Sequence, residues 1–154
     1  MSNDSRVKLL DGLRNTVIEV MGTMAWSSVQ FAGMEETDDF ILKDEVAGLI
    51  QLFGHHQGMV GISCKETLGR ELVGRMVGLA VEDLTPEDLR DGVAELANMI
   101  CGGMKTKAQI SELNLSPPVA IIGRDYIAQW KTDHATMVLT FLIEEEVFLV
   151  HACI

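Results

Sequence analysis

A strong helix start followed by a regular apolar pattern constrains the fold more than any other feature of this chain. Thr85 is a good N-cap, Pro86 suits the first helical position, and Asp88 stands three residues after the cap. From Leu89 to about Thr106, apolar residues recur at helical spacing and form a face about 100° wide. This face consists of Leu89, Val93, Leu96, Ala97, Ile100 and Met104. The sequence therefore predicts a long helix that packs on one side.

The opposite side of this predicted helix carries a narrow polar stripe. At about 100° per residue, four positions fall within roughly 60° of one another: Asp91, Glu95, Asn98 and Gly102. A carboxylate and a carboxamide three residues apart can act together on a partner. The same spacing occurs on ordinary solvated helix faces, so the pair alone is a weak indication of function.

The glycine pair at the end of this stripe strengthens the indication. Two glycines inside a helix cost about 2 kcal/mol relative to alanine, so Gly102 and Gly103 need a reason. Close approach of a partner surface is one reason. A kink, or packing against the helix predicted before this one, is another. A similar pair, Gly74 and Gly78, predicts close approach of another backbone to that preceding helix.

The rest of the pattern predicts an α+β fold, with an antiparallel or mixed β-sheet packed against three helices. The other two helices are expected at Asp4–Met24, capped by Asp4 or Ser5, and at Thr67–Leu79. Strands are expected at Val46–Phe53, Met59–Cys64, Val119–Ile122, Tyr126–Lys131, His134–Ile143 and Val147–Cys153. The first two of these strands are expected to pair as a hairpin, and the last two to form a hairpin around Glu144–Glu146. The segment Glu35–Asp39 is expected to be a charged loop. Pro117 and Pro118 demand an edge or a break between two short strands.

Composition narrows the classes of function. A length of 154 residues favours one domain, residues 1–154. The net charge is −11 with no basic cluster, which argues against nucleic acid as a partner. No apolar run approaches the length of a membrane span, and the N-terminus does not read as a signal peptide. Three widely spaced cysteines fit reduced thiols, so a cytoplasmic protein is expected.

Three other groups of residues can be interpreted either as functional or as purely structural. Adjacent histidines, His55 and His56, favour a polar turn over a metal site, because side chains next to each other point in different directions. Cys101 lies next to the apolar side of the long helix, which favours a buried thiol over a nucleophile. Trp26 and Trp130 can each anchor an interface or pack in the core.

The long helix also resembles a known signature. The pattern Asp91-x-x-x-Glu95-x-x-Asn98, continued through Gly102 to Lys105, resembles that of the CheC/CheX/FliY phosphatases, which dephosphorylate the chemotaxis response regulator CheY. The segment 59–63, a glycine-containing helix, and the Leu-Ser-Pro element at 115–117 before Gly123 follow in the order that this family shows. The resemblance covers roughly residues 8–153. The proline pair comes a few residues earlier than in the family, which indicates a shorter loop.

The resemblance implies the single-site CheX form and a homodimer joined at sheet edges. CheC carries two such helices. Here the first helix offers Asp11 at the position of Asp91, but it has Asn15 where Glu is needed and Ile18 where Asn is needed. The implied activity is hydrolysis of the aspartyl phosphate of a CheY-like receiver domain, in chemotaxis or two-component signalling. The implied catalytic residues are Glu95 and Asn98.

In that interpretation Asn98 orients a water molecule, because a carboxamide both donates and accepts hydrogen bonds, and Glu95 pairs with a cationic group of the receiver. Asp91, Gly102 and Lys105 contact the partner. No metal or cofactor is expected on this chain, since Mg²⁺ is expected only in the receiver domain. Two alternatives remain open: a module that binds a receiver without hydrolysis, and a structural subunit of a flagellar switch or signalling complex.

Overall fold

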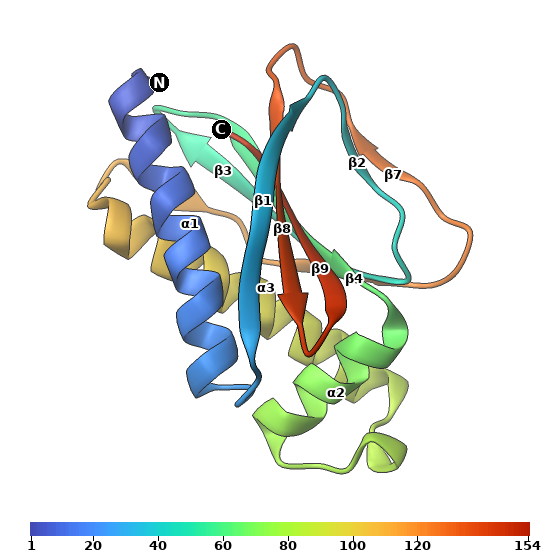
Figure 1. Ribbon diagram of the computed structural model, residues 1–154. Helices are drawn as coiled ribbons and strands as arrows, with labels where there is room; N and C mark the ends of the chain where they lie inside the picture. The colour runs from blue at the N-terminus through green and yellow to red at the C-terminus, as the bar shows by residue number, and fades with distance from the viewer.

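The computed structural model describes residues 1–154. Its three long helices lie on one side of a seven-stranded sheet (Figure 1). The helices are α1 (Asn3–Thr23), α2 (Glu66–Val77) and α3 (Pro86–Ala108), with a short 3₁₀ turn, η1 (Val81–Asp83), between the last two. The strands are β1 (Val29–Thr37), β2 (Phe40–Leu42), β3 (Val46–Gly54), β4 (Gly58–Cys64), β5 (Leu113–Leu115), β6 (Val119–Ile122), β7 (Ala128–Trp130), β8 (Thr136–Ile143) and β9 (Glu146–Cys153). The predicted α+β class is confirmed.

The main sheet is antiparallel throughout. Its strand order is β1-β8-β9-β4-β3-β5, and β6 also pairs with β3. The two predicted hairpins are confirmed, since β3 pairs with β4 and β8 pairs with β9. The break at the proline pair is confirmed as well: β5 lies along the end of β3 with Leu52 opposite Leu115, and β6 lies along its start with Leu49 opposite Val119.

Two predictions about the strands are wrong. The segment Glu35–Asp39 was expected as a loop, but Glu35, Glu36 and Thr37 belong to β1, which pairs with β8 along one edge of the sheet. Charged side chains are tolerated there because an edge strand is exposed to solvent. The segment Tyr126–Lys131 was expected to extend the main sheet. Instead its residues 128–130 pair with β2 in a separate two-stranded sheet, called the arm below.

The helix ends also differ slightly from the prediction. The cap of α1 is Ser2, whose hydroxyl accepts the backbone N–H of Ser5 at 3.1 Å. Helix α2 ends at Val77 because Gly78 adopts a left-handed conformation with φ of 72°. A side chain at Gly74 would meet the carbonyl oxygen of Leu79 at 2.8 Å. The close backbone approach predicted for this glycine pair is therefore found at Gly74, where the chain that follows the helix makes it. A side chain at Gly78 would meet nothing within 4 Å.

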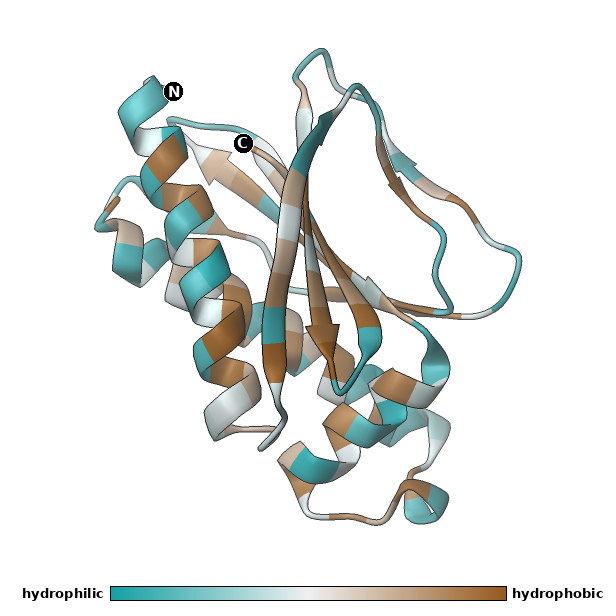
Figure 2. Ribbon diagram, in the orientation of Figure 1, coloured by the Kyte–Doolittle hydropathy of each residue, from teal (hydrophilic) through white to brown (hydrophobic).

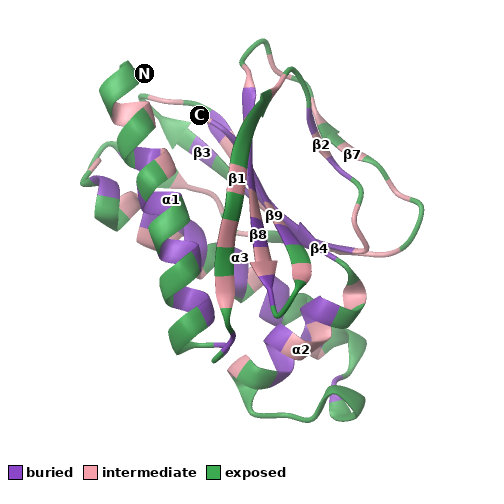
Figure 3. Cartoon of the chain, viewed as in Figure 1, coloured by how far each residue is buried: buried purple, intermediate pink, exposed green.

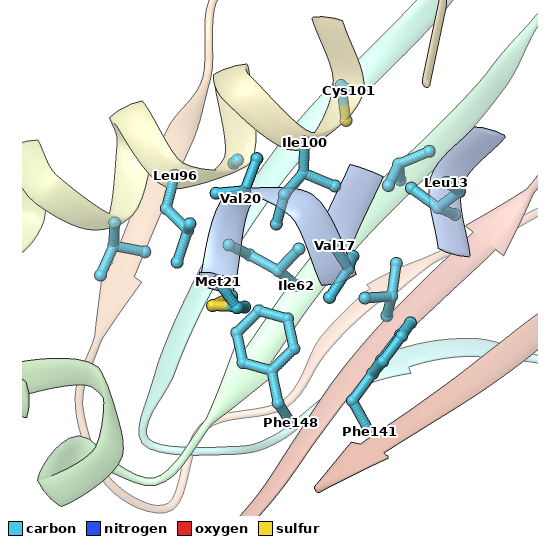
Figure 4. Close-up of a cluster of buried hydrophobic side chains, with 14 of the residues drawn as sticks. Leu13, Val17, Val20, Met21, Ile62, Leu96, Ile100, Cys101, Phe141 and Phe148 are labelled. Atoms are coloured by element: carbon cyan, nitrogen blue, oxygen red, sulfur yellow. The ribbon is translucent and has the colours of Figure 1, made fainter. Parts of the chain in front are cut away.

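The main core lies between the helices and the sheet. In Figure 4 the side chains of Val17, Val20 and Met21 from α1 meet Leu96 and Ile100 from α3 over the aromatic side chains of the β8–β9 hairpin. Figure 2 shows hydrophobic residues along the central strands and on alternating parts of the helices. A smaller apolar cluster, Phe40, Leu42, Ala47 and Cys153, joins the arm to the other face of the sheet.

Candidate functional site

Helix α3 begins as the sequence predicts. The backbone N–H of Asp88 donates to the Thr85 hydroxyl at 3.0 Å, and the backbone N–H of Thr85 donates to the Asp88 carboxylate at 3.0 Å. This reciprocal pair satisfies two donors that a helix start otherwise leaves without partners. Pro86 occupies the first turn. Residues 85–88 therefore fix where α3 begins. The start of the helix in turn sets where each later residue lies along it.

The predicted apolar face of α3 is confirmed. All six of its residues are buried: Leu89, Val93, Leu96, Ala97, Ile100 and Met104. Cys101 is also buried, and burial raises the pKa of its thiol to about 12. A thiol with this pKa is protonated near neutral pH and is a poor nucleophile. The buried interpretation of Cys101 is confirmed.

The polar stripe of α3 faces solvent. Asp91, Glu95 and Asn98 are exposed, whereas Gly102 and Lys105 are half-buried. The side chains of Asp91, Glu95, Asn98 and Lys105 make no hydrogen bond or ion pair within the chain. Glu95 and Asn98 are one helical turn apart, so a carboxylate and a carboxamide are both free for a partner or for water. Figure 3 shows how exposed residues of the helices alternate with buried ones that face the sheet.

The two glycines of the predicted pair have different surroundings. A side chain at Gly103 would collide with the side chain of Thr16 on α1, so this glycine lets α1 and α3 pack closely. A side chain at Gly102 would meet nothing within 4 Å. Packing against a helix thus explains Gly103, although the partner is α1 and not the helix that precedes α3. No contact within the chain explains Gly102.

A third glycine of α3 fixes its contact with α2. A side chain at Gly92 would collide with Val73 of α2. Gly92 and Gly103 are eleven residues apart, so they point in directions that differ by only about 20°. Helices α1 and α2 therefore pack along the same side of α3, beside the polar stripe. Together with the apolar face, these contacts set the rotation of α3 that leaves Glu95 and Asn98 in solvent.

The equivalent surface of α1 lacks the pair. Asp11, Asn15 and Ile18 are exposed on α1, with Ile18 in place of a carboxamide. Next to them, the Lys107 ammonium of α3 lies 2.7 Å from the carboxylate of Glu19. One Glu-x-x-Asn stripe is therefore present on the helical layer.

Sequence reasoning missed two contacts that position this layer. Thr16 and Gly103 meet across the α1–α3 contact, and small residues at helical spacing on α1 are the signal that indicates it. The Arg75 guanidinium of α2 donates to both carboxylate oxygens of Glu144 at 2.6 and 2.9 Å and to the Ser27 hydroxyl at 2.8 Å. No short-range signal indicates that cluster, because its three residues are far apart in the sequence.

Two features that the structure lacks bear on the class of site. No group of three or more His, Cys, Asp or Glu side chains is close enough to hold a metal ion. None of the helices has both the length and the apolar character needed to cross a lipid bilayer.

Comparison with known proteins adds a family to this geometry. Residues 46–142 match the family model described as chemotaxis phosphatase CheX, and this region contains all of α3. The chain belongs to the CheX family. No curated protein sequence matches this CheX-family chain.

Solved structures share its fold. The chemotaxis protein CheX from Desulfovibrio desulfuricans has 19% identity and a TM-score of 0.84, covering 94% of this chain and 97% of that chain. A CheC-like superfamily protein from Shewanella sp. PV-4 has 27% identity and a TM-score of 0.80, covering 99% and 98%. A CheX–CheY–BeF₃–Mg²⁺ complex from Borrelia burgdorferi matches with 16% identity and a TM-score of 0.69, covering 94% and 96%. In that complex a CheX relative binds CheY.

Proposed function

We propose that this CheX-family protein hydrolyses the aspartyl phosphate of a CheY-like receiver domain. The observation that carries the proposal is the pair Glu95 and Asn98 on the exposed stripe of α3. Neither side chain is engaged within the chain, and the opposite side of the same helix is buried. The B. burgdorferi complex supports a receiver as the partner, because a relative of the same fold binds CheY.

Asn98 orients the attacking water in this proposal. An aspartyl phosphate is already activated, and the receiver holds it with its own divalent metal and lysine. Hydrolysis then needs a water molecule in line with the bond that breaks. The Asn98 amide accepts a hydrogen bond from that water through its oxygen and donates one through its nitrogen. The water oxygen forms the new bond to phosphorus, the receiver carboxylate leaves, and inorganic phosphate is released.

Glu95 holds the receiver in place. An exposed carboxylate one turn from Asn98 can form a charge-assisted hydrogen bond with a lysine near the phosphoryl group. Such a bond fixes the distance between Asn98 and the phosphorus atom. Asp91 and Lys105 extend this contact along α3 with charges of opposite sign, and Gly102 lets the receiver backbone come close.

The test is phosphate release from phosphorylated receiver domains with three variants. Asn98→Ala should abolish the acceleration over the spontaneous rate and retain the fold, because the Asn98 side chain is exposed and makes no hydrogen bond within the chain. Glu95→Ala should weaken both binding and rate. Gln109→Ala is the matched control, since Gln109 is an exposed amide side chain beyond the end of α3. Full acceleration by the Asn98→Ala protein would refute the assignment.

A module that binds a receiver without hydrolysis is the alternative function. It predicts binding of the phosphorylated receiver with no acceleration of phosphate release by the wild-type chain. The unengaged Asn98 favours the enzyme, because binding alone does not require an amide that positions water. A homodimer joined at sheet edges is also proposed, and β1 at one edge of the sheet has no partner on its outer side.

A further inference from the structure

An exposed apolar patch lies where the end of α1 meets α2 and η1. Trp26 is 81% exposed, Leu79 43% and Val81 38%. These three residues, called the Trp26 patch, line a shallow hollow of about 470 Å³ together with Gly74 and Gly78. Figure 1 shows the place where α1 ends close to α2. Single exposed apolar residues are ordinary, but several around one hollow mark an interaction surface.

The backbone holds Trp26 outward at a cost. Its φ is 48°, a left-handed conformation that costs a residue other than glycine about 1–3 kcal/mol. The neighbours on both sides are fixed. Ala25 is fully buried, and the backbone N–H of Ser27 donates to the carbonyl of Met21 at 2.8 Å. The Ser27 hydroxyl also accepts a hydrogen bond from Arg75 at 2.8 Å. The chain therefore keeps a large aromatic side chain in solvent in a defined position.

The unpaired charges around the Trp26 patch are negative. Arg70 donates to the carbonyl of Val81 at 3.0 Å, but its guanidinium is paired with Glu66. Arg75 is the one cation that lines the hollow, and its charge is balanced by Glu144. Glu71 lines the hollow too, and Glu82 and Asp83 follow the patch directly on η1. These three carboxylates form no ion pair within the chain. The surface that fits is an apolar projection flanked by lysine or arginine side chains.

The Trp26 patch adjoins the layer that carries the candidate site. Helix α2, which supplies one wall of the hollow, packs on α3 with Val73 against Gly92, next to Asp91. The stripe of α3 has no large apolar side chain of its own. A specific interface covers about 800 Å² on each partner and is held mainly by a few buried anchors, with tryptophan prominent among them. A partner centred on Asn98 must extend beyond α3 to reach such an anchor.

We infer that the Trp26 patch is the apolar anchor for the receiver domain that reacts at Asn98. This inference rests on the proposed function, because the receiver is the partner named there. The receiver contacts the patch with an apolar side chain flanked by basic ones, while its phosphorylation site faces Glu95 and Asn98. Trp26 acts in binding and does not touch the reacting atoms.

The variant Trp26→Gly tests this inference without weakening the fold. Glycine adopts a positive φ readily, so the folded protein should be at least as stable as the wild type in urea unfolding. The probe is a CheY receiver domain loaded with beryllofluoride and Mg²⁺. Its Kd by titration calorimetry should rise by about tenfold or more, and KM for the phosphorylated receiver should rise in parallel with kcat unchanged. Ile127→Ala is the matched control, since Ile127 is 73% exposed but adjoins the arm; its Kd should equal that of the wild type.

The outcomes separate the inference from the proposed function. An unchanged Kd for Trp26→Gly, or an equal change for Ile127→Ala, overturns the inference, while loss of hydrolysis in Asn98→Ala still supports the enzyme. A weakened Kd for Trp26→Gly alone, in a wild-type protein that does not accelerate phosphate release, supports the anchor and refutes the enzyme. No binding of the loaded receiver by the wild type overturns the anchor.

Discussion

Substitutions at Gly102 allow the stability of the fold and the docking of a receiver to be measured separately. It lies inside α3, where glycine costs about 1 kcal/mol relative to alanine, and a side chain at this position meets nothing within 4 Å. Gly102→Ala should therefore stabilise the folded chain by about 1 kcal/mol and raise Tm by roughly 2–4 °C for a domain of this size. If a receiver backbone comes close at Gly102, the same methyl group should slow phosphate release.

A longer side chain sharpens this contrast. Leucine is nearly as good a helix former as alanine, so Gly102→Leu should keep most of the gain in stability. It should lower kcat/KM for the phosphorylated receiver by at least about tenfold, equivalent to ~1.4 kcal/mol. Thermal unfolding and phosphate release are measured on the same preparations. The expected result is a series, glycine to alanine to leucine, in which activity falls while stability does not.

Gly103→Ala is the control for the structural part of the argument. Its methyl group would collide with Thr16, which is 2% exposed and cannot move into solvent. Overpacking of this kind costs about 1–3 kcal/mol, so this variant should be less stable. Loss of stability in Gly102→Ala would refute the account of open space at Gly102. Unchanged kcat/KM in Gly102→Leu would refute close approach of the receiver.

Four other predictions concern the fold, its pH dependence and its assembly. Thr85→Ala should lose about 1 kcal/mol in urea unfolding because the cap of α3 is removed, whereas Thr85→Ser should retain it. The bond to Arg75 lowers the pKa of Glu144 below its ordinary value of 4.5, so its contribution is present above pH 4.5 and lost as the pH falls. The stability difference between wild type and Glu144→Gln should therefore shrink below pH 4.5, and a constant difference would contradict this. Burial raises the pKa of Cys64 and Cys101 to about 12, so both thiols should resist disulfide reagents at pH 8 until the protein unfolds; labelling of the native protein at the rate of free cysteine would contradict this. Sedimentation at micromolar concentration should show a dimer, and a 16.9 kDa species would count against the edge-joined assembly.

The predictable parts of this fold are those decided within a few residues. The capping pair of Thr85 and Asp88, the apolar face of α3 and the hairpin around Glu144 depend on local pattern, and the structure has each of them. Strand β1 was missed because Glu35 and Glu36 look like loop residues when the pairing with β8 is unknown. The arm was missed because Phe40–Leu42 is too short to be recognised without its partner β7.

The candidate site also has parts that the local sequence predicts and parts that depend on distant segments. The side of α3 that carries Glu95 and Asn98 follows from helical periodicity alone. The different surroundings of Gly102 and Gly103 do not, because they depend on where Thr16 of α1 lies. The sequence also left the exposure of Trp26 open, because a tryptophan at this position can either anchor an interface or pack in the core. Its backbone conformation depends on contacts with distant segments, such as the bond between Ser27 and Arg75.

The three glycines of α3 mean that the site cannot exist as a peptide. A 23-residue segment with Gly92, Gly102 and Gly103 gives up about 3 kcal/mol of helix propensity relative to alanine, so the isolated sequence is expected to be largely unstructured in water. It becomes a helix only when the sheet, α1 and α2 pack against it. Transplanting the Glu95–Asn98 pair onto another protein would therefore require the neighbouring helices and the sheet as well, and a partner that pulls α1 away from α3 would weaken the support of the site.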